Sequence, residues 1–120
     1  MTAIAVGARF EQRALACLER AGLKRVESNY RTRFGELDLV MCDGDTLVFV
    51  EVRYRRHAQF GGGAASVGPA KRERLVRAAQ GFLQTHPQFA SAPCRFDVVA
   101  FDGDAGAVSC DWQRAAFEMF

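Results

Sequence analysis

The sequence has no long hydrophobic run: within its 120 residues, no apolar stretch approaches the roughly 20 residues that a membrane-spanning helix needs. Its first residues, Met-Thr-Ala-Ile-Ala-Val-Gly-Ala-Arg, lack the basic start and the long apolar segment of a secretory signal peptide. These absences argue against membrane insertion and secretion. We therefore expect a cytoplasmic protein without a membrane partner.

Cysteine, histidine and glycine motifs for metals or nucleotides are also missing. The four cysteines, Cys17, Cys42, Cys94 and Cys110, have no CxxC spacing, and the chain contains 2 histidines. This usage argues against a zinc enzyme and a disulfide framework, and it favours free thiols. Neither a Walker A motif nor a dinucleotide fingerprint can be read in the glycine-rich segment 55–68, which we expect to be a mobile loop. Nothing in the sequence supports a nucleotide cofactor.

Charge is unevenly distributed in a chain of otherwise ordinary composition. The hydrophobic content of 49 % and charged content of 25 % fit a single globular domain over residues 1–120. Residues 52–77 contain seven Arg and Lys against one acid, a charge of +6, so the rest of the chain carries −4 of the net +2. Such a basic stretch suits a phosphate-bearing polymer, and a solvated helix face beside an Arg-rich loop is the other explanation.

The stretch with the strongest pattern, residues 35–53, predicts a β-hairpin, because an Asp-Gly pair stands between two apolar runs. If the turn spans Asp43 to Thr46, the numbers of paired residues sum to 89, which places Asp38 opposite Glu51. Opposed side chains have Cβ atoms about 4.5–5.5 Å apart, so the two carboxylates should meet. The opposite face should carry Leu37, Leu39, Met41, Val48, Val50 and Val52.

Two carboxylates that face each other destabilise a sheet, and burial increases the cost. A divalent cation, a proton shared by the pair, or a neighbouring arginine such as Arg53 can compensate. Mg²⁺ is held by one or two carboxylates with waters and substrate phosphates. Two acids beside a cationic side chain are also what metal-assisted phosphodiester hydrolysis needs. The spacing alone leaves a catalytic metal pair and a structural ion pair open.

Hydrophobic periodicity and turn residues predict the remaining elements. A strand, a helix and a further strand form a βαβ unit, whose second strand should run parallel to the 47–53 strand. The fold class is therefore α/β, with a central mixed sheet (an antiparallel hairpin, then the βαβ unit) flanked by helices. We expect helices over 7–21 and from Pro69 to the residue before His86-Pro87, strands over 23–33 and 94–101, a short edge strand over 107–110, and a final helical piece from Asp111.

Further charged residues are candidates for the same site. Glu11 aligns with the apolar stripe of the first helix, so it can point along the core edge toward the hairpin; its place in the first turn is also explained by the helix dipole. Asp97 is either another acid of the centre or a partner for an arginine. The predicted phosphate contacts, some of which can instead neutralise the acids, are Arg31, Arg33, Arg55, Arg56, Lys71 and Arg74.

Three segments carry a resemblance to a known family: NYRTRFGELDLV over residues 29–40, FVEVRYR over 49–55 and RFDVV over 95–99. They resemble the YraN family of small bacterial proteins, whose fold is similar to the restriction-endonuclease-like PD-(D/E)xK nucleases, in particular Holliday-junction resolvases. The resemblance implies that Asp38 and Glu51 are metal ligands, that Glu11 is a third ligand carried by a helix, and that Arg53 belongs to the catalytic set.

The resemblance also implies an activity: a Mg²⁺- or Mn²⁺-dependent endonuclease acting on branched or structured DNA rather than RNA, with a homodimer expected from the resolvase-like relatives. One departure matters, because the lysine of the nuclease motif is Arg53 here. Arginine effectively cannot lose its proton to help activate water, although it can stabilise charge on phosphoryl oxygens. Lys71 is the residue that could supply the missing ammonium. The alternative is a module that binds nucleic acid or a partner without hydrolysis.

Overall fold

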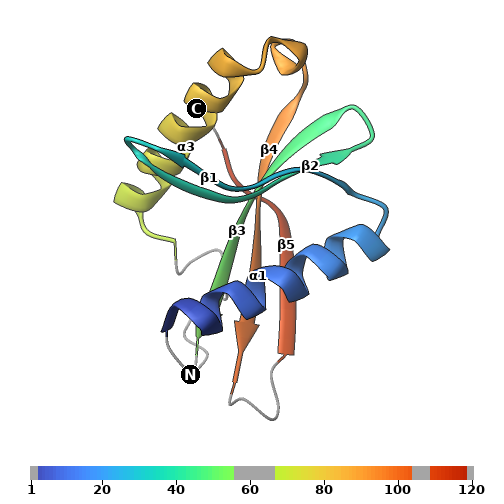
Figure 1. Cartoon of the computed structure of the whole chain (residues 1–120), viewed down its shortest axis with the longest axis vertical. Helices are drawn as coiled ribbons and strands as arrows, with labels where there is room; N and C mark the ends of the chain where they lie inside the picture. Colours follow the sequence, from blue (N-terminus) through green and yellow to red (C-terminus); the bar gives the residue numbers. More distant parts are fainter. Residues whose placement is uncertain (1–2, 56–66, 104–108, 119–120) are drawn as a thin grey trace.

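The fold, described by a computed structural model over residues 3–55, 67–103 and 109–118, is a five-stranded sheet between two helices (Figure 1). The strand order is β1-β2-β3-β4-β5; β3 and β4 are parallel and the other neighbours antiparallel. This is the mixed α/β sheet that the sequence predicts. The elements are α1 (Ala3–Arg20), β1 (Lys24–Thr32), β2 (Gly35–Asp43), β3 (Thr46–Arg55), α3 (Pro69–Thr85), the 3-10 helix η1 (Pro87–Phe89), β4 (Cys94–Asp102) and β5 (Ser109–Phe117).

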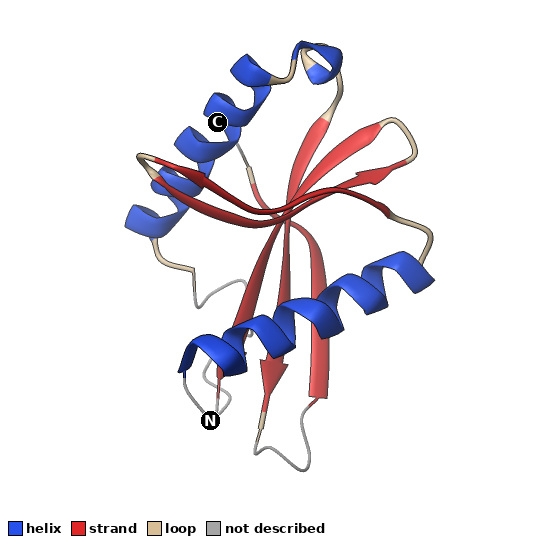
Figure 2. Cartoon of the chain, viewed as in Figure 1, coloured by secondary structure: helices blue, strands red, loops and turns tan. Residues whose placement is uncertain are grey.

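Each helix covers its own face of the sheet, so the protein has two apolar cores (Figure 2). The α1-side core contains Phe10, Ala14 and Leu18 of the helix, packed on Val48 and Val50 of β3. The α3-side core gathers around Phe82 of the second helix. Its other buried members include Val40, Leu47, Phe49, Leu75, Phe96 and Val98. No helix among the described residues is long and apolar enough to cross a membrane.

Local sequence fixes both helix ends that matter for this arrangement. Gly22 has φ of +98°, and behind it Leu23 N donates to Leu18 O at 3.1 Å, which is the hydrogen-bond pattern of a Schellman C-cap. Pro69 stands in the first turn of α3, where its missing N–H costs nothing, and the helix ends at Thr85. Both of these ends agree with the prediction, but α1 begins at Ala3 and not at residue 7, so Glu11 does not lie in its first turn. The predicted glycine-rich loop lies mostly outside the described residues, with Arg56 in it.

The β2–β3 hairpin has the predicted register. Leu39 pairs with Val50 and Asp43 with Thr46, so paired numbers sum to 89 as expected. Gly44 has φ of +58° at the first position of the two-residue turn, which is the requirement of a type II′ hairpin. Because side-chain direction alternates along a strand, this register decides which face each residue occupies.

β2 and β3 separate immediately beyond the Leu39–Val50 pair. Residues 35–37 of β2 continue to pair with β1, while residues 51–55 of β3 continue to pair with β4. The two strands therefore form a fork, and in Figure 1 the β1–β2 pair crosses β3 and β4 at a steep angle. The predicted face of Leu37 is wrong for this reason. Leu37 packs into the α3-side core, because this part of β2 does not pair with β3.

The prediction for the C-terminal region is also wrong. Asp111 does not begin a helix; residues from Ser109 to Phe117 form one strand, β5, antiparallel to β4. The register shifts opposite Asp97, and Ala115 adopts φ of +49° there. Such a bulge leaves a backbone N–H without a ladder partner, and the Asp97 carboxylate accepts it, with Ala115 N at 3.0 Å from Oδ1. The strand thus depends on a buried side chain of its neighbour.

Asp97 is a structural acid that lies apart from the predicted centre. Its side chain is 0 % exposed, and Trp112 Nε1 donates to Oδ2 at 3.0 Å. Arg95 Nε lies 3.1 Å from Oδ1, and Nη1 of the same guanidinium lies 2.9 Å from Oδ2 of Asp43. The alternative in which Asp97 pairs with an arginine is therefore the correct one.

We expect Asp97→Ala to cost roughly 3–5 kcal/mol of unfolding free energy, because the half-buried Arg95 keeps only Asp43 as a partner and two further donors, Trp112 Nε1 and Ala115 N, lose their buried acceptor. Urea unfolding followed by tryptophan fluorescence measures this loss. Asp45→Ala is the matched control, since Asp45 is exposed in the β2–β3 turn and its removal should leave the midpoint unchanged. A midpoint for Asp97→Ala equal to that of the control would contradict the structural role.

Candidate metal centre

Asp38 occupies the fork between β2 and β3. The backbone hydrogen bonds between the two strands end at the Leu39–Val50 pair. Beyond it, Val52 N donates to Oδ2 of Asp38 at 2.9 Å. The carboxylate thereby satisfies a donor that the separation of the strands would leave unpaired. The Oδ1 atom of Asp38 takes no part in this hydrogen bond. The fold thus fixes one carboxylate at the centre of the molecule.

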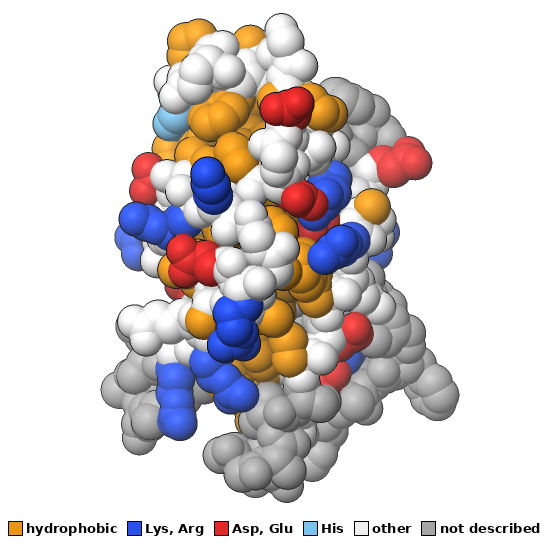
Figure 3. Space-filling view, turned by 90° about the vertical axis from the view of Figure 1, so that its right-hand side faces the viewer, with side chains coloured by type: hydrophobic (Ala, Val, Ile, Leu, Met, Phe, Trp, Pro, Cys, Tyr) orange, Lys and Arg blue, Asp and Glu red, His pale blue; other side chains and the backbone are white. Residues whose placement is uncertain are grey.

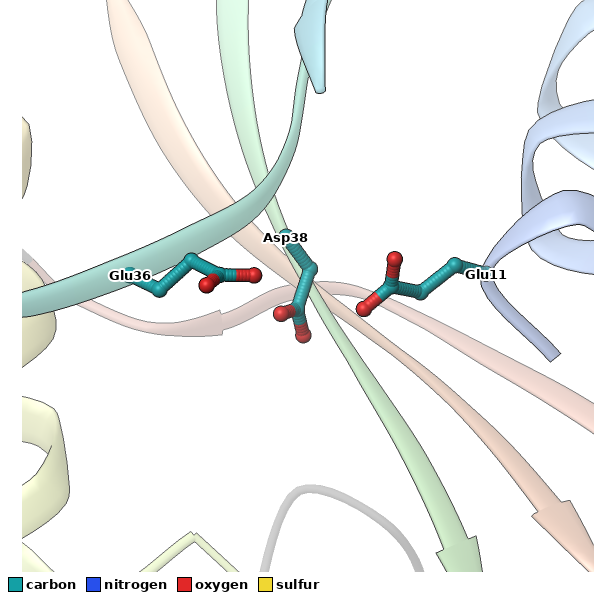
Figure 4. Close-up of side chains that lie close together, drawn as sticks. All are labelled: Glu11, Glu36 and Asp38. Carbon is teal, nitrogen blue, oxygen red and sulfur yellow. The ribbon is translucent and has the colours of Figure 1, made fainter. Parts of the chain in front are cut away.

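Glu11 and Glu36 approach Asp38 from opposite sides. One carboxylate oxygen of each of the three residues lies within 4.8 Å of the others, and all three are half-buried. Figure 4 shows Asp38 between the two glutamates, whose carboxylates both turn toward it from α1 and β2. The predicted direction of Glu11 is therefore correct. Burial, then the charges of Asp38 and Glu36, raise the pKa of Glu11 above its usual value.

Asn29 holds two of these carboxylates in place. With its amide nitrogen directed at them, it donates to Glu11 Oε2 and to Glu36 Oε1, both at 2.8 Å. The residue has φ of +53°, a conformation that asparagine tolerates better than most residues. Arg31 adds a contact at the rim, with Nε 3.3 Å from Glu36 Oε2.

Glu51 lies behind Asp38 and is 5 % exposed. Asp38 and Glu51 are not paired across the strands as predicted, because the ladder ends at Leu39–Val50, but the two acids are close enough for Asp38 to act on the pKa of Glu51. Lys71 Nζ, from the first turn of α3, lies 3.2 Å from Glu51 Oε2. The angles at this ion pair are outside hydrogen-bond geometry, so Oε2 accepts no hydrogen bond from the described part of the chain.

Burial and the neighbouring Asp38 raise the pKa of Glu51 to about 8. Lys71 acts in the opposite direction, but its side chain is 36 % exposed and it offsets only part of the effect. The ion pair and the raised pKa favour different protonation states of Glu51. We give more weight to the raised pKa, because desolvation is its largest cause and a partly solvated ammonium is screened.

The donor set fits a hard divalent cation. Such ions take carboxylate oxygens, and the three acids at 4.8 Å or less could each offer one to a common ion. Glu51 also supports a cation site. Its buried Oε2 lies beside the three acids and accepts no hydrogen bond from the described residues. Amide and ammonium groups of Asn29 and Lys71 orient the carboxylates, as outer groups do at metal sites.

The centre opens to the surface between α1 and the β1–β2 pair. A cavity of about 460 Å³ is lined by Glu11, Asn29, Arg31 and Glu36, with Gly7 and Ala8 at its edge. An adjoining cavity of about 430 Å³ shares Glu11 and Asn29. Both are open, so Glu11 and Glu36 are accessible to a large ligand.

The predicted basic residues occupy different surroundings. Arg53 is half-buried on β3 opposite Ala100. Arg55 makes a paired contact with Asp102, with Nε 2.7 Å from Oδ1 and a side chain 10 % exposed. That geometry gives no support to a phosphate contact by Arg55.

Two other predicted arginines remain at the surface. Arg33 lies over the Phe34 ring at the β1–β2 turn, 4.8 Å from its centroid, and Arg74 of α3 is exposed. Figure 3 shows Lys and Arg side chains on the face that it draws, with Asp and Glu side chains and hydrophobic atoms between them.

Sequence reasoning missed Glu36 and Asn29 as members of the centre. Glu36 precedes Asp38 by two positions on one strand, so alternation alone could have placed both on the same face. Asn29 carried no comparable signal, because its contribution depends on a positive φ that brings the amide between Glu11 and Glu36.

A mixed sheet between two helices, with acids at the fork of β2 and β3, defines a restriction-endonuclease-like α/β protein. A model of the uncharacterised protein family UPF0102 matches residues 10–101. The chain belongs to this family, the YraN family.

The curated relatives that it resembles are UPF0102 proteins. One from Xanthomonas campestris pv. campestris is 58% identical over 113 residues, which cover 94% of this chain and 91% of the relative. Another from Stutzerimonas stutzeri is 54% identical and one from Pseudomonas fluorescens 52% identical, each covering about nine tenths of both chains.

Proposed function

We propose that the protein is a divalent-metal-dependent endonuclease that hydrolyses the phosphodiester backbone of branched or otherwise structured DNA. The observation that carries the proposal is the accessible cluster of Glu11, Glu36 and Asp38, set in the fork of the sheet with buried Glu51 behind it. A purely structural cluster would leave unexplained why Glu11 and Glu36 line one open cavity beside Asp38.

In this proposal the acids would hold the metal ion and Lys71 would contact the phosphate. Asp38, Glu11 and Glu36 would hold Mg²⁺ or Mn²⁺, with Glu51 as the ligand implied by the nuclease motif. The ion would supply charge that stabilises a phosphoryl oxygen and lowers the pKa of water. Lys71 stands beside Glu51 and is 36 % exposed, so its ammonium can donate to a phosphate oxygen in place of the motif lysine that Arg53 replaces.

Nucleic-acid binding would come from the basic residues around the cavity. Arg31 at its rim, Arg33 at the β1–β2 turn and exposed Arg74 can contact phosphates without reading sequence. Affinity should therefore fall steeply with salt. Structured DNA is the favoured substrate by family resemblance, and a homodimer would suit two symmetric cuts.

A second candidate is a module that binds nucleic acid without cleaving it. The presence of Arg53 at the lysine position favours it, because arginine does not act as a proton acceptor. The ion pair of Lys71 with Glu51 also gives both residues a structural role.

The test is cleavage of a labelled panel (duplex, single strand, flap and four-way junction) with Mg²⁺ or Mn²⁺, by the natural chain and by Lys71→Met. We expect cleavage of the branched substrates by the natural chain and a loss of about 10²-fold or more for Lys71→Met, with little change in binding. Lys24→Met, an exposed lysine on β1, is the control. Binding without cleavage of any substrate in either metal would favour the second candidate.

A further inference from the structure

Two cysteines that are distant in the sequence share one cavity. Cys17 lies on α1 and Cys110 on β5, and both line an open space of about 320 Å³. The two thiols are close enough that Cys17, after burial, is the next cause of the raised pKa of Cys110. The same cavity is lined by Arg13 and Arg20, which stand four residues before and three after Cys17 and therefore flank it on the helix surface.

The register of β5 explains why the thiols meet. Cys110 pairs with Phe101 and Trp112 with Val99, and these β4 residues belong to the core beneath α1. Directly opposed residues of an antiparallel pair point to the same face, so Cys110 projects toward α1. The contact is set by tertiary structure and does not depend on a local motif.

The other two cysteines cannot pair. Cys42 and Cys94 both lie opposite Leu47, on the strands to either side of it. Two strand spacings separate them by roughly 9–10 Å, whereas Cα atoms of a disulfide are within about 7 Å. All four cysteines are free thiols, but the fold brings one pair together and holds the other apart.

We propose that Cys17 and Cys110 form a redox-active dithiol, which low-molecular-weight disulfides such as oxidised glutathione convert into a disulfide linking α1 to β5. The Cys17 thiolate attacks one sulfur of the oxidant, forming a mixed disulfide and releasing one thiolate. Cys110 then loses its proton and attacks Cys17 sulfur, releasing the second thiol. Two protein S–H bonds are lost, one S–S bond forms, and the oxidant is reduced to two thiols.

The surroundings favour this order of attack. Arg13 and Arg20 line the same cavity, so positive charge stands beside the two thiols. Burial, then the neighbouring Cys17, raise the pKa of Cys110, so Cys110 is the thiol that reacts second. The finished bond would close a loop of more than ninety residues, which is the kind of crosslink that stabilises most. It would also tie down the helix that carries Glu11.

The test uses the full chain with Cys42→Ala and Cys94→Ala, which retains only the proposed pair, equilibrated in glutathione buffers of rising oxidised fraction. We expect the intact mass to fall by two hydrogen atoms, both thiols to become unreactive, and digestion to give a Cys17–Cys110 crosslinked peptide. The melting temperature should rise by more than about 5 °C. Non-reducing peptide mapping of the natural chain gives the same readout if the double variant does not fold.

Adding Cys110→Ser to that background removes the second thiol, and a glutathione adduct should then persist on Cys17. Full retention of both thiols in oxidised glutathione would overturn the proposal. So would a lasting glutathione adduct on the chain that retains both cysteines, or crosslinks only between molecules.

Discussion

Asp38→Asn is expected to remove metal-dependent cleavage, lowering the rate by about 10³-fold or more, and to weaken Mn²⁺ binding by at least about 10²-fold. Asp38 stands between Glu11 and Glu36, so no other described carboxylate can reach both. Asparagine keeps an oxygen that can accept from Val52 N, and the fork of the sheet should therefore survive. A loss of cleavage and of Mn²⁺ binding would therefore be due to the missing negative charge of Asp38 and not to unfolding.

Isothermal titration with Mn²⁺ and single-turnover cleavage measure the two effects separately. Asp45→Asn makes the same chemical change at an exposed position in the β2–β3 turn, and it should behave as the natural chain does. Unchanged Mn²⁺ affinity in Asp38→Asn would place any metal elsewhere. Metal binding that is lost in Asp38→Asn, when the natural chain cuts no substrate, would support the centre but argue against hydrolysis.

Glu51→Gln is expected to raise the stability of the metal-free protein in alkaline solution. The folded-state pKa of Glu51, about 8, is higher than its ordinary value of 4.5, so the folded chain holds the proton more tightly than the unfolded chain. The resulting stabilisation is complete below about pH 4.5, declines between 4.5 and 8, and is gone above 8. At about 1.4 kcal/mol for each pH unit, the full change approaches 5 kcal/mol.

Glutamine has no proton to lose, so the difference in unfolding free energy between Glu51→Gln and the natural chain should grow as the pH rises through this window. Urea titrations at about pH 5, 7 and 9 without divalent metal measure it. Glu19→Gln, an exposed residue of α1, controls for the loss of a carboxylate and should show no such trend. A difference that stays constant with pH would show that Glu51 is ionised throughout, with Lys71 as its full counterion.

The sequence alone determined the hairpin and its register as far as Leu39–Val50. An Asp-Gly turn of fixed length sets this pairing, so it follows from neighbours close in the chain. The C-terminal end of α1 and the start of α3 were predictable for the same reason, since Gly22 and Pro69 act through backbone conformation within one turn. Asp38 and Glu51 lie just beyond the paired region, where the fork of the sheet decides their positions. The family resemblance indicated the same acids.

Only the tertiary structure decided the composition of the centre. Asn29 joins it because a positive φ brings its amide between Glu11 and Glu36, and the sequence does not mark that conformation. The point where β2 and β3 separate, beyond the Leu39–Val50 pair, is not marked in the sequence either. Likewise, Ser109–Phe117 form a strand because the buried carboxylate of Asp97 accepts the backbone N–H that its bulge exposes. Local propensity favoured a helix there and lost to a contact 18 residues away. Partners at this separation are chosen by packing of the whole chain, which no local pattern encodes.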